Sequence, residues 1–358
     1  MHTSVRILLA LAAVSGVAGC QTIGPGSVQR DRLNYAAAIA DSWKEQALLN
    51  IVKLRYFDTP VFLDVASVIS SYTLQSQIDL TARIFPDSPS DTFRNLGASG
   101  LYTDRPTISY APLTGEKYVN NLLRPIPPQA IFAMIQAGHQ ADYILQAAVR
   151  AINDVYNYSG GSPARARRED PTFPLVIRAF RRIQQAGALG VRIEKRGAAE
   201  VTLIFFRENA SEDVVKDIRL LREALGIGPD KKEIALNFGS LRSSDGEIAL
   251  LTRSMMEMLV EFSAGIEVPR QHLLEGRART APENVAQASP SQAPLARIHS
   301  GSEPPRDAYV AVRYRNYWFW IDDRDLESKR AFMFLRIFSS IAETGTVPLV
   351  PIITIPAN

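Results

Sequence analysis

The rarest reactive side chain in this sequence is a thiol. Among 358 residues there is one cysteine, Cys20, and there are four histidines. Cys20 follows a positively charged start at Arg6, an apolar run over residues 7–18 and one small residue, Gly19. This order is typical of a signal peptide that is cleaved close to the end of its apolar run. A thiol at that boundary indicates a covalently modified cysteine rather than a catalytic one.

The sequence Val17-Ala-Gly-Cys20 resembles the lipobox of bacterial lipoproteins. The resemblance implies removal of residues 1–19 and attachment of acyl chains, palmitate among them, to the sulfur and the new amino group of Cys20. Each buried methylene contributes about 0.8 kcal/mol, so two or three acyl chains hold a protein on a membrane. Gln21 after the cysteine implies the periplasmic side of the outer membrane, with the cell surface as the alternative.

An ordinary secretory signal and an uncleaved anchor helix are the other interpretations of this segment. Residues 7–18 are too few to cross a bilayer, which needs roughly 20 apolar residues. We therefore expect a mature chain that is anchored by lipid and begins with a short tether over residues 20–30. After acylation no thiol is left, so disulfides are excluded even though the compartment would permit them.

Charge and composition argue against a nucleic-acid-binding protein and for a chain with a sizeable apolar core. Without the signal peptide the chain has 39 basic and 37 acidic side chains, too even a balance to indicate a nucleic-acid partner. The apolar fraction of 46% is enough for a sizeable core. One short basic run, Arg165, Arg167 and Arg168, lies in a glycine- and proline-rich loop. That run is a solvated loop or, in the alternative, a contact for anionic lipid headgroups.

The sequence offers no recognisable catalytic or metal-binding constellation. His139 is the one histidine expected in ordered sequence outside the signal, and its position after Gly138 indicates capping or packing. His272 and His299 flank or occupy a segment that we expect to be disordered, so no zinc or iron site is predicted, and no cofactor. The acidic run 322–327 lacks the pattern of a calcium loop and fits the N-terminus of a helix.

The first folded region is expected over residues 31–158. An amphipathic helix over residues 31–55 packs on the domain or, in the alternative, lies on the membrane. Residues 61–108 are β-rich and predict a hairpin with a long loop. Helices are then expected over residues 116–124, 128–137 and 141–156.

The second region, residues 172–358, predicts an α+β domain with a mixed sheet and packed helices. Its proline-rich stretch 275–307 has no apolar period and predicts a long disordered insertion. Ser244 and Glu247 fit a capping box that opens a long helix to about residue 263. The order hairpin, helix, strand occurs over residues 191–238 and again over 308–355, which predicts two related β-β-α-β units on one sheet.

The C-terminal hairpin has the most specific local pattern. Tyr314 and Tyr317 flank a two-residue turn at Arg315-Asn316, and such a turn fixes the register of the strands. Counting outward gives the expected pairs: Val312 with Phe319, Val310 with Ile321, Arg313 with Trp318, and Ala311 with Trp320. Both faces are aromatic, which indicates core on both sides or, in the alternative, a patch that binds a partner.

Residues 112–117, 317–330, 343–345 and 354–356 resemble an uncharacterised family of Gram-negative outer-membrane lipoproteins. The resemblance implies location and a shared architecture, and it assigns no catalytic, cofactor-binding or metal-binding residue. Together with Cys20 it favours a non-enzymatic protein that binds an envelope partner or takes part in envelope assembly. The alternatives are a carrier of lipid or another small ligand, which needs an apolar cavity, and a glycan hydrolase, which needs two converging carboxylates.

Overall fold

The structure is a computed structural model of the whole chain. It describes residues 25–69, 72–83, 93–104, 107–159, 170–196, 199–207, 209–278 and 294–342. These residues divide into two compact units, one holding 25–60 and 114–342 and the other holding 61–113. The expected regions 31–158 and 172–358 do not correspond to these units, because parts of both lie in the first. Cys20 and the basic loop at residues 165–168 lie outside the described residues.

The first unit holds most of the helices and strands. Its helical elements are α2 (Pro25–Arg55), α3 (Gly115–Tyr118), the π-helical turn η3 (Val119–Leu123), α4 (Pro128–Gln136), α5 (Ala141–Ala148), α6 (Phe173–Gln185), α7 (Glu212–Leu225), α8 (Met255–Ser263), α9 (Arg270–Leu274) and α10 (Leu326–Ala342). Its strands are β5 (Val149–Ile152), β6 (Val155–Tyr156), β7 (Leu189–Arg196), β8 (Ala199–Phe206), β9 (Glu233–Phe238), β10 (Glu247–Thr252), β11 (His299–Gly301), β12 (Ala308–Tyr314) and β13 (Tyr317–Asp322).

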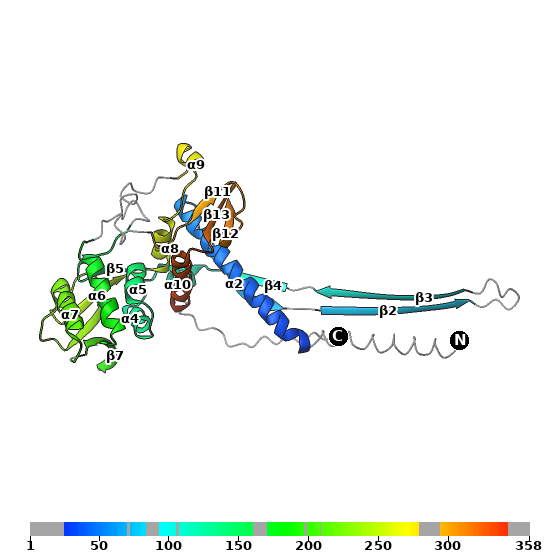
Figure 1. Cartoon of the computed structure of the whole chain (residues 1–358). Helices are drawn as coiled ribbons and strands as arrows, with labels where there is room; N and C mark the ends of the chain where they lie inside the picture. The colour runs from blue at the N-terminus through cyan, green and yellow to red at the C-terminus, as the bar shows by residue number, and fades with distance from the viewer. Residues whose placement is uncertain are drawn as a thin grey trace. The chain divides into compact units, whose positions relative to one another are not determined.

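A six-stranded sheet organises one half of this unit. Its strand order is β6-β5-β10-β9-β8-β7, and β9 and β10 run parallel while the other neighbours are antiparallel. Helix α4 packs on β7, β9 and β10, and α5 and α6 pack beside it (Figure 1). Apolar side chains such as Ile131, Phe132 and Phe180 are fully buried in this layer. The predicted α+β fold with a mixed sheet is confirmed.

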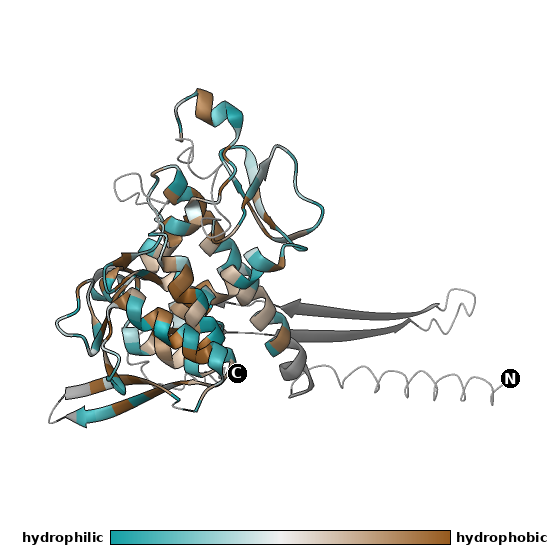
Figure 2. Cartoon of the chain, turned by 60° about the vertical axis from the view of Figure 1, so that its left-hand side comes forward, coloured by the Kyte–Doolittle hydropathy of each residue, from teal (hydrophilic) through white to brown (hydrophobic). Residues whose placement is uncertain are grey.

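The other half of this unit has a smaller three-stranded sheet, ordered β11-β13-β12, together with helices α2, α8 and α10, of which α10 contacts α8. Helix α2 contacts both β12 and α8, so its C-terminal half packs on the domain as the amphipathic pattern predicts. Leu48, Ile51 and Val52 are its fully buried residues. The helices carry hydrophobic and hydrophilic residues in alternating stretches along each ribbon (Figure 2), as expected when one face of each helix is buried.

The C-terminal hairpin has the predicted register, and all four predicted pairs are present. Arg315 and Asn316 have φ angles of 46° and 67°, the left-handed values that a two-residue turn of this twist requires. Phe319 and Ile321 are fully buried. The sequence pairs Arg313 with Trp318 and so favours a cation–π contact there, but in the described residues the hairpin cation that lies over aromatic rings is Arg315.

The second unit consists of paired strands. Strands β1 (Leu63–Ile69) and β4 (Thr107–Pro112) form one antiparallel pair, and β2 (Tyr72–Arg83) and β3 (Phe93–Asp104) form another. The expected hairpin in this region is present, but its second strand begins at Phe93, inside the glycine-, serine- and proline-rich stretch 86–100 that the sequence predicts as the loop. Among the described residues of the whole chain, no helix combines the length and the apolar composition that crossing a bilayer requires.

The helix predicted over residues 141–156 is wrong beyond Ala148. Strands β5 and β6 follow α5, joined by a turn in which Asn153 and Asp154 have φ angles of 46° and 64°. The β-branched residues Val149 and Ile152 fit a pleated strand, and β5 pairs with β10 on one side and with the edge strand β6 on the other. Asn153 stabilises the turn because its amide donates to the carbonyls of Leu225 and Glu247.

The capping box predicted at Ser244 and Glu247 is also wrong. Residues 247–252 form β10, which lies between β5 and β9 and is buried. A buried strand has a continuous apolar run that periodicity does not separate from a helix. The capping box lies instead at Ser254 and Glu257, where Glu257 N donates to Ser254 Oγ at 3.2 Å and opens α8.

Three further segments differ in the structure from what the sequence predicts. The tether predicted over residues 20–30 is helical from Pro25 onward. The insertion predicted as disordered over 275–307 is ordered at residues 294–307, where Ile298 is fully buried and bridges Ile266, and residues 279–293 lie outside the described part. The two β-β-α-β units do not share a sheet, because β12 and β13 belong to the three-stranded sheet; the expected strand 347–355 lies outside the described residues.

Candidate functional site

The C-terminus of helix α2 has a phenylalanine where glycine is usual. The N–H of Asp58 donates to the carbonyl of Lys53 at 2.9 Å, and the N–H of Phe57 donates to that of Leu54 at 3.2 Å. These two bonds define a Schellman cap, which places Phe57 at the position that takes a left-handed backbone. Its φ angle is 57°.

Within the described residues, four other helices of this unit end in the same pair of bonds, and each has glycine at the left-handed position. They are α4, α6, α7 and α9, with Gly138, Gly187, Gly226 and Gly276. A side chain in this conformation costs about 1–2 kcal/mol, because Cβ comes too close to the following carbonyl oxygen. Phe57 carries that cost and is still 70% exposed. Burial of its ring within the described part of the chain therefore does not repay the strain.

The residue before Phe57 anchors the helix end to two distant segments. The hydroxyl of Tyr56 forms a hydrogen bond of 2.7 Å with Nδ1 of His272 on α9, and both side chains are buried. The ring of Tyr56 also lies against Tyr314 of β12 and Phe319 of β13. Tyr56 thus joins α2, α9 and the C-terminal hairpin.

The residue after Phe57 makes polar contacts with the same hairpin. Asp58 accepts a hydrogen bond from the hydroxyl of Tyr314 and forms an ion pair of 2.9 Å with Arg315. The guanidinium of Arg315 lies 5.3 Å from the ring centroid of Tyr56 and 5.4 Å from that of Tyr314. Both chain neighbours of Phe57 are therefore fixed, so the position of its backbone is held from two sides.

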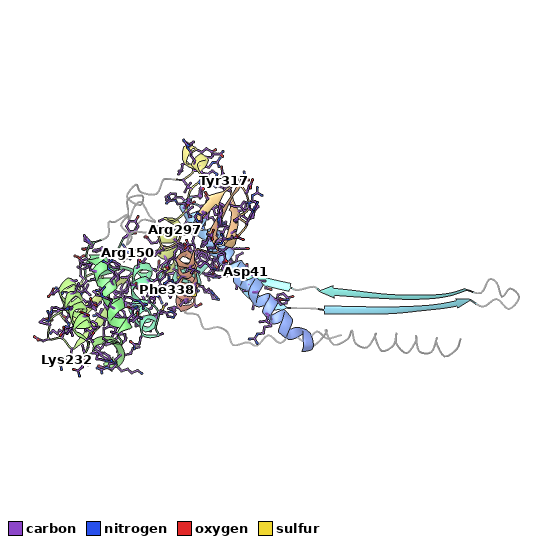
Figure 3. All side chains as sticks on the ribbon, viewed as in Figure 1. Asp41, Arg150, Lys232, Arg297, Tyr317 and Phe338 are labelled. Carbon is purple, nitrogen blue, oxygen red and sulfur yellow. The ribbon has the colours of Figure 1, made fainter. Side chains whose placement is uncertain are left out.

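Helix α9 completes this region. Tyr317 lies close to α9 (Figure 3), with its hydroxyl 3.1 Å from Oε1 of Gln271 and its ring 4.8 Å from that of His272. Leu274, two residues after His272, is 79% exposed. We name Phe57, Tyr314, Arg315 and Tyr317 the Phe57 surface. Its side chains are large, mostly aromatic and partly or fully accessible.

The electrostatics of this region fit binding better than proton transfer. Burial raises the pKa of Tyr56 to about 12, with the charge of Arg315 acting in the opposite direction. Burial, with the charge of Arg277, lowers the pKa of His272 below its usual value. Near neutral pH the bond between them therefore joins two uncharged groups. A tyrosine so hard to ionise is a poor nucleophile, whereas exposed aromatic side chains and an arginine are typical of protein-binding surfaces.

A second candidate surrounds the buried Arg253. Its guanidinium donates to the carbonyls of Gln146, Ala147 and Tyr158, and burial lowers its pKa. A cavity of about 20 Å³ lies beside it, large enough for one water molecule and too small for a lipid chain. Arg253 therefore has a structural role, linking the end of α5 to residue 158, and the cavity gives no support to a ligand-carrying function.

The residues singled out from sequence occupy separate places. His139 packs edge-on against Phe334, in agreement with a packing role. Nδ1 of His299 lies 3.1 Å from a carboxylate oxygen of Glu267, so His299 has a different partner from His272. Asp325 accepts hydrogen bonds from the N–H and hydroxyl of Ser328 at the start of α10, so it is the expected helix cap. Within the described residues no three histidine, cysteine or acidic side chains are grouped as metal ligands would be.

Sequence reasoning missed Phe57, Tyr56 and the role of His272. In a sequence, the end of a helix is normally indicated by a glycine. At the end of α2 there is no glycine, and this absence is the sequence signal that points to Phe57. Comparison of this chain with protein-family models, with curated proteins and with solved structures found no match.

Proposed function

We propose that this chain is a lipid-anchored, non-enzymatic protein of the bacterial cell envelope that binds a protein partner through the Phe57 surface. The observation that carries the proposal is Phe57 itself, an exposed aromatic residue held in a left-handed conformation that four equivalent helix ends assign to glycine. A side chain that costs stability and is not buried in its own chain is explained when a partner buries it.

The chemistry of the surface indicates the kind of partner. Phe57 and the two tyrosines offer apolar area with few rotatable bonds, and Arg315 offers donors that its ion pair with Asp58 holds in place. An apolar side chain flanked by a carboxylate on the partner would complement this set. This is the composition of a protein surface rather than that of a nucleic acid or a glycan.

The distance from the proposed anchor supports the same function. Helix α2 has 31 residues and begins five residues after Cys20. At 1.5 Å per residue it is about 46 Å long, and Phe57 lies just beyond its far end. Acyl chains on Cys20 and the Phe57 surface would therefore act at opposite ends of one rigid helix. This arrangement suits a protein that is held at a membrane and binds at a distance from it.

Crosslinking in cells tests the proposal. The full chain with a C-terminal tag is crosslinked, solubilised and purified, together with Phe57→Gly, Leu241→Ser and Cys20→Ala variants. Leu241 is the matched control, because its side chain is 71% exposed and lies elsewhere in the unit. We expect one stoichiometric envelope partner that is lost from Phe57→Gly and kept by Leu241→Ser.

The anchoring control separates the two parts of the proposal. Cys20→Ala should leave the membrane fraction, whereas Phe57→Gly should remain in it. Recovery of the same partner from Phe57→Gly at the wild-type level would show that the Phe57 surface is not the binding site. Retention of Cys20→Ala in the outer membrane would contradict the lipid anchor.

A further inference from the structure

The β2–β3 ribbon of the second unit is long for a pair of strands with no other partner. Twelve consecutive residue pairs join it, from Tyr72 opposite Asp104 to Arg83 opposite Phe93, without a bulge. Within the described residues, β2 and β3 pair only with each other. Each strand therefore has an outer edge whose backbone N–H and C=O groups have no strand partner in the described part of the chain.

The register sorts the residues of the ribbon onto two faces, because successive residues of a strand alternate between faces. The even-numbered residues of both strands share one face, which we name the apolar face. From β2 it takes Tyr72, Leu74, Ser76, Ile78, Leu80 and Ala82. From β3 it takes Arg94, Leu96, Ala98, Gly100, Tyr102 and Asp104. The other face takes Thr73, Gln75, Gln77, Asp79, Thr81 and Arg83, with Asn95, Gly97, Ser99 and Thr103, and also Phe93 and Leu101.

The charges on the apolar face occur only toward its two ends. Arg94 is opposite Ala82 near the turn, Asp104 is opposite Tyr72 at the other end, and the pairs between them are uncharged. The charge in the middle of the ribbon, Asp79, is on the opposite face. Tyr72 and Tyr102 are near one limit of the uncharged band. Aromatic residues at the limits of an apolar band are typical of strands that cross a lipid bilayer.

The spacing of the two charged limits agrees with a membrane. From position 72, opposite Asp104, to position 82, opposite Arg94, a strand rises about 34 Å at 3.4 Å per residue, which is roughly 24 Å across a membrane when the strand is tilted by about 45°. The uncharged pairs between these limits, from Leu74 to Leu80, take up about 20 Å of that rise. The apolar bands of membrane-spanning strands are about 25 Å tall. An edge of this length in a soluble protein would normally be shortened or interrupted.

We infer that the β2–β3 ribbon inserts into a lipid bilayer, with its apolar face toward the hydrocarbon and its outer edges paired with the ribbons of further copies of this chain. The pairing is required because backbone groups without partners are not tolerated in hydrocarbon. The edge of β3 in one copy is paired with the edge of β2 in the next. The polar face, rich in threonine, glutamine, serine and asparagine, then faces water inside the assembly.

This inference goes beyond the proposed function and does not depend on the Phe57 surface. It assigns the second unit a lipid bilayer to enter and a second copy of the chain as its neighbour. Acyl chains on Cys20 would bring copies together on one membrane surface, which raises their local concentration for edge pairing.

Cysteine substitution along β2 tests the insertion. Single cysteines are placed at positions 74 to 81 of the full acylated chain and labelled with an environment-sensitive fluorophore, with the labelled parent protein as the blank. Vesicles of phosphatidylethanolamine and phosphatidylglycerol are then added. We expect a shift to shorter wavelength and loss of iodide quenching at even positions, and no change at odd ones. An equal response at both sets, or none at either, would overturn the inference.

Two arginine variants test the edge pairing. Ile78→Arg places a charge in the centre of the apolar face, and Gln77→Arg places the same charge next to it on the polar face. With vesicles, we expect amine crosslinking to give oligomers in the wild type and in Gln77→Arg but only monomer in Ile78→Arg, with near-ultraviolet circular dichroism of all three unchanged. Wild-type protein that stays monomeric on vesicles, or equal oligomers in both variants, would contradict the proposal.

The outcomes also separate this inference from the proposed function. An Ile78→Arg variant that still captures the envelope partner would show that the Phe57 surface acts independently of the ribbon. Loss of partner capture in Phe57→Gly with normal oligomers would show the converse.

Discussion

Tyr56 and His272 are 216 residues apart in the chain, and the hydroxyl of one lies 2.7 Å from the ring nitrogen Nδ1 of the other. This bond closes the C-terminus of α2 onto α9. Because both side chains are buried, water cannot replace a lost partner. The pair therefore holds Phe57, the next residue, in position.

Removing the Tyr56 hydroxyl should destabilise the first unit. In Tyr56→Phe the ring of Tyr56 is kept, but Nδ1 of His272 loses its partner in a buried place, which costs about 1–3 kcal/mol. Urea unfolding followed by tryptophan fluorescence measures the change. Tyr35→Phe on the exposed part of the same helix is the control and should change the free energy of unfolding very little. Equal stability of the two variants would show that the bond contributes nothing.

His272 should make stability depend on pH. Its pKa is lowered in the folded protein below the usual value of 6.5, so the unfolded chain takes up the proton more readily. The stabilisation is present above about pH 6.5 and is lost as pH falls below that value. Melting temperatures between pH 7.5 and pH 5.5 measure the effect. A His272→Gln variant should show a flatter profile over this range, and an unchanged slope would assign the dependence to another group.

Glu247 should act in a lower pH range. Its buried carboxylate accepts hydrogen bonds from the Asn237 amide at 2.7 Å and from the N–H of Ser243 at 3.0 Å, and the bond from Asn237 is the main cause of its lowered pKa. Its contribution is therefore present above pH 4.5, the ordinary value, and is lost as pH falls further.

Glu247→Gln tests the same contacts at neutral pH. The amide keeps one acceptor oxygen but brings its NH2 group against the other of the two donors, which should cost about 1–3 kcal/mol of unfolding free energy. Glu233→Gln, at an exposed ion pair on the neighbouring strand, is the comparison and should cost little. A loss of equal size in both variants would show that the loop between β9 and β10 does not depend on Glu247.

Phe57→Gly should stabilise the protein while it weakens binding. Glycine adopts the left-handed conformation without strain, so the unfolding free energy should rise by about 1 kcal/mol and the melting temperature by ~2 °C. Calorimetry measures the change. Phe57→Ala removes the ring but keeps Cβ, and it should lose the partner without the gain in stability. A Phe57→Gly variant less stable than the wild type would show that the ring is packed within the chain.

Local patterns predicted those elements whose sequence signals are local. The register of the C-terminal hairpin follows from the two residues Arg315 and Asn316, and the helix predicted over residues 128–137 is α4, which begins at Pro128. The strand β10 and the strands after Ala148 could not be distinguished from helices, because their identity depends on neighbours in the sheet.

The candidate site was harder to predict for the same reason. The proline-rich composition of residues 275–307 predicts a disordered segment beside His272, although His272 is buried. Its burial depends on Tyr56 and Tyr317, which are distant in sequence. Phe57 has no positive sequence signal. It becomes informative only when its backbone is compared with the four glycines at equivalent helix ends.

The base of the strand pairs in the second unit is narrow. The N–H of Leu113 donates to the carbonyl of Phe62 at 2.9 Å, next to the pair of Leu63 and Pro112. The two ends of the strand pairs, at Phe62 and Leu113, are therefore joined by a backbone hydrogen bond, whatever the length of the strands between them. Length can change during evolution without disturbing this base, provided that each strand gains or loses two residues at a time. A change of one residue in each strand would exchange the two faces for every pair beyond it.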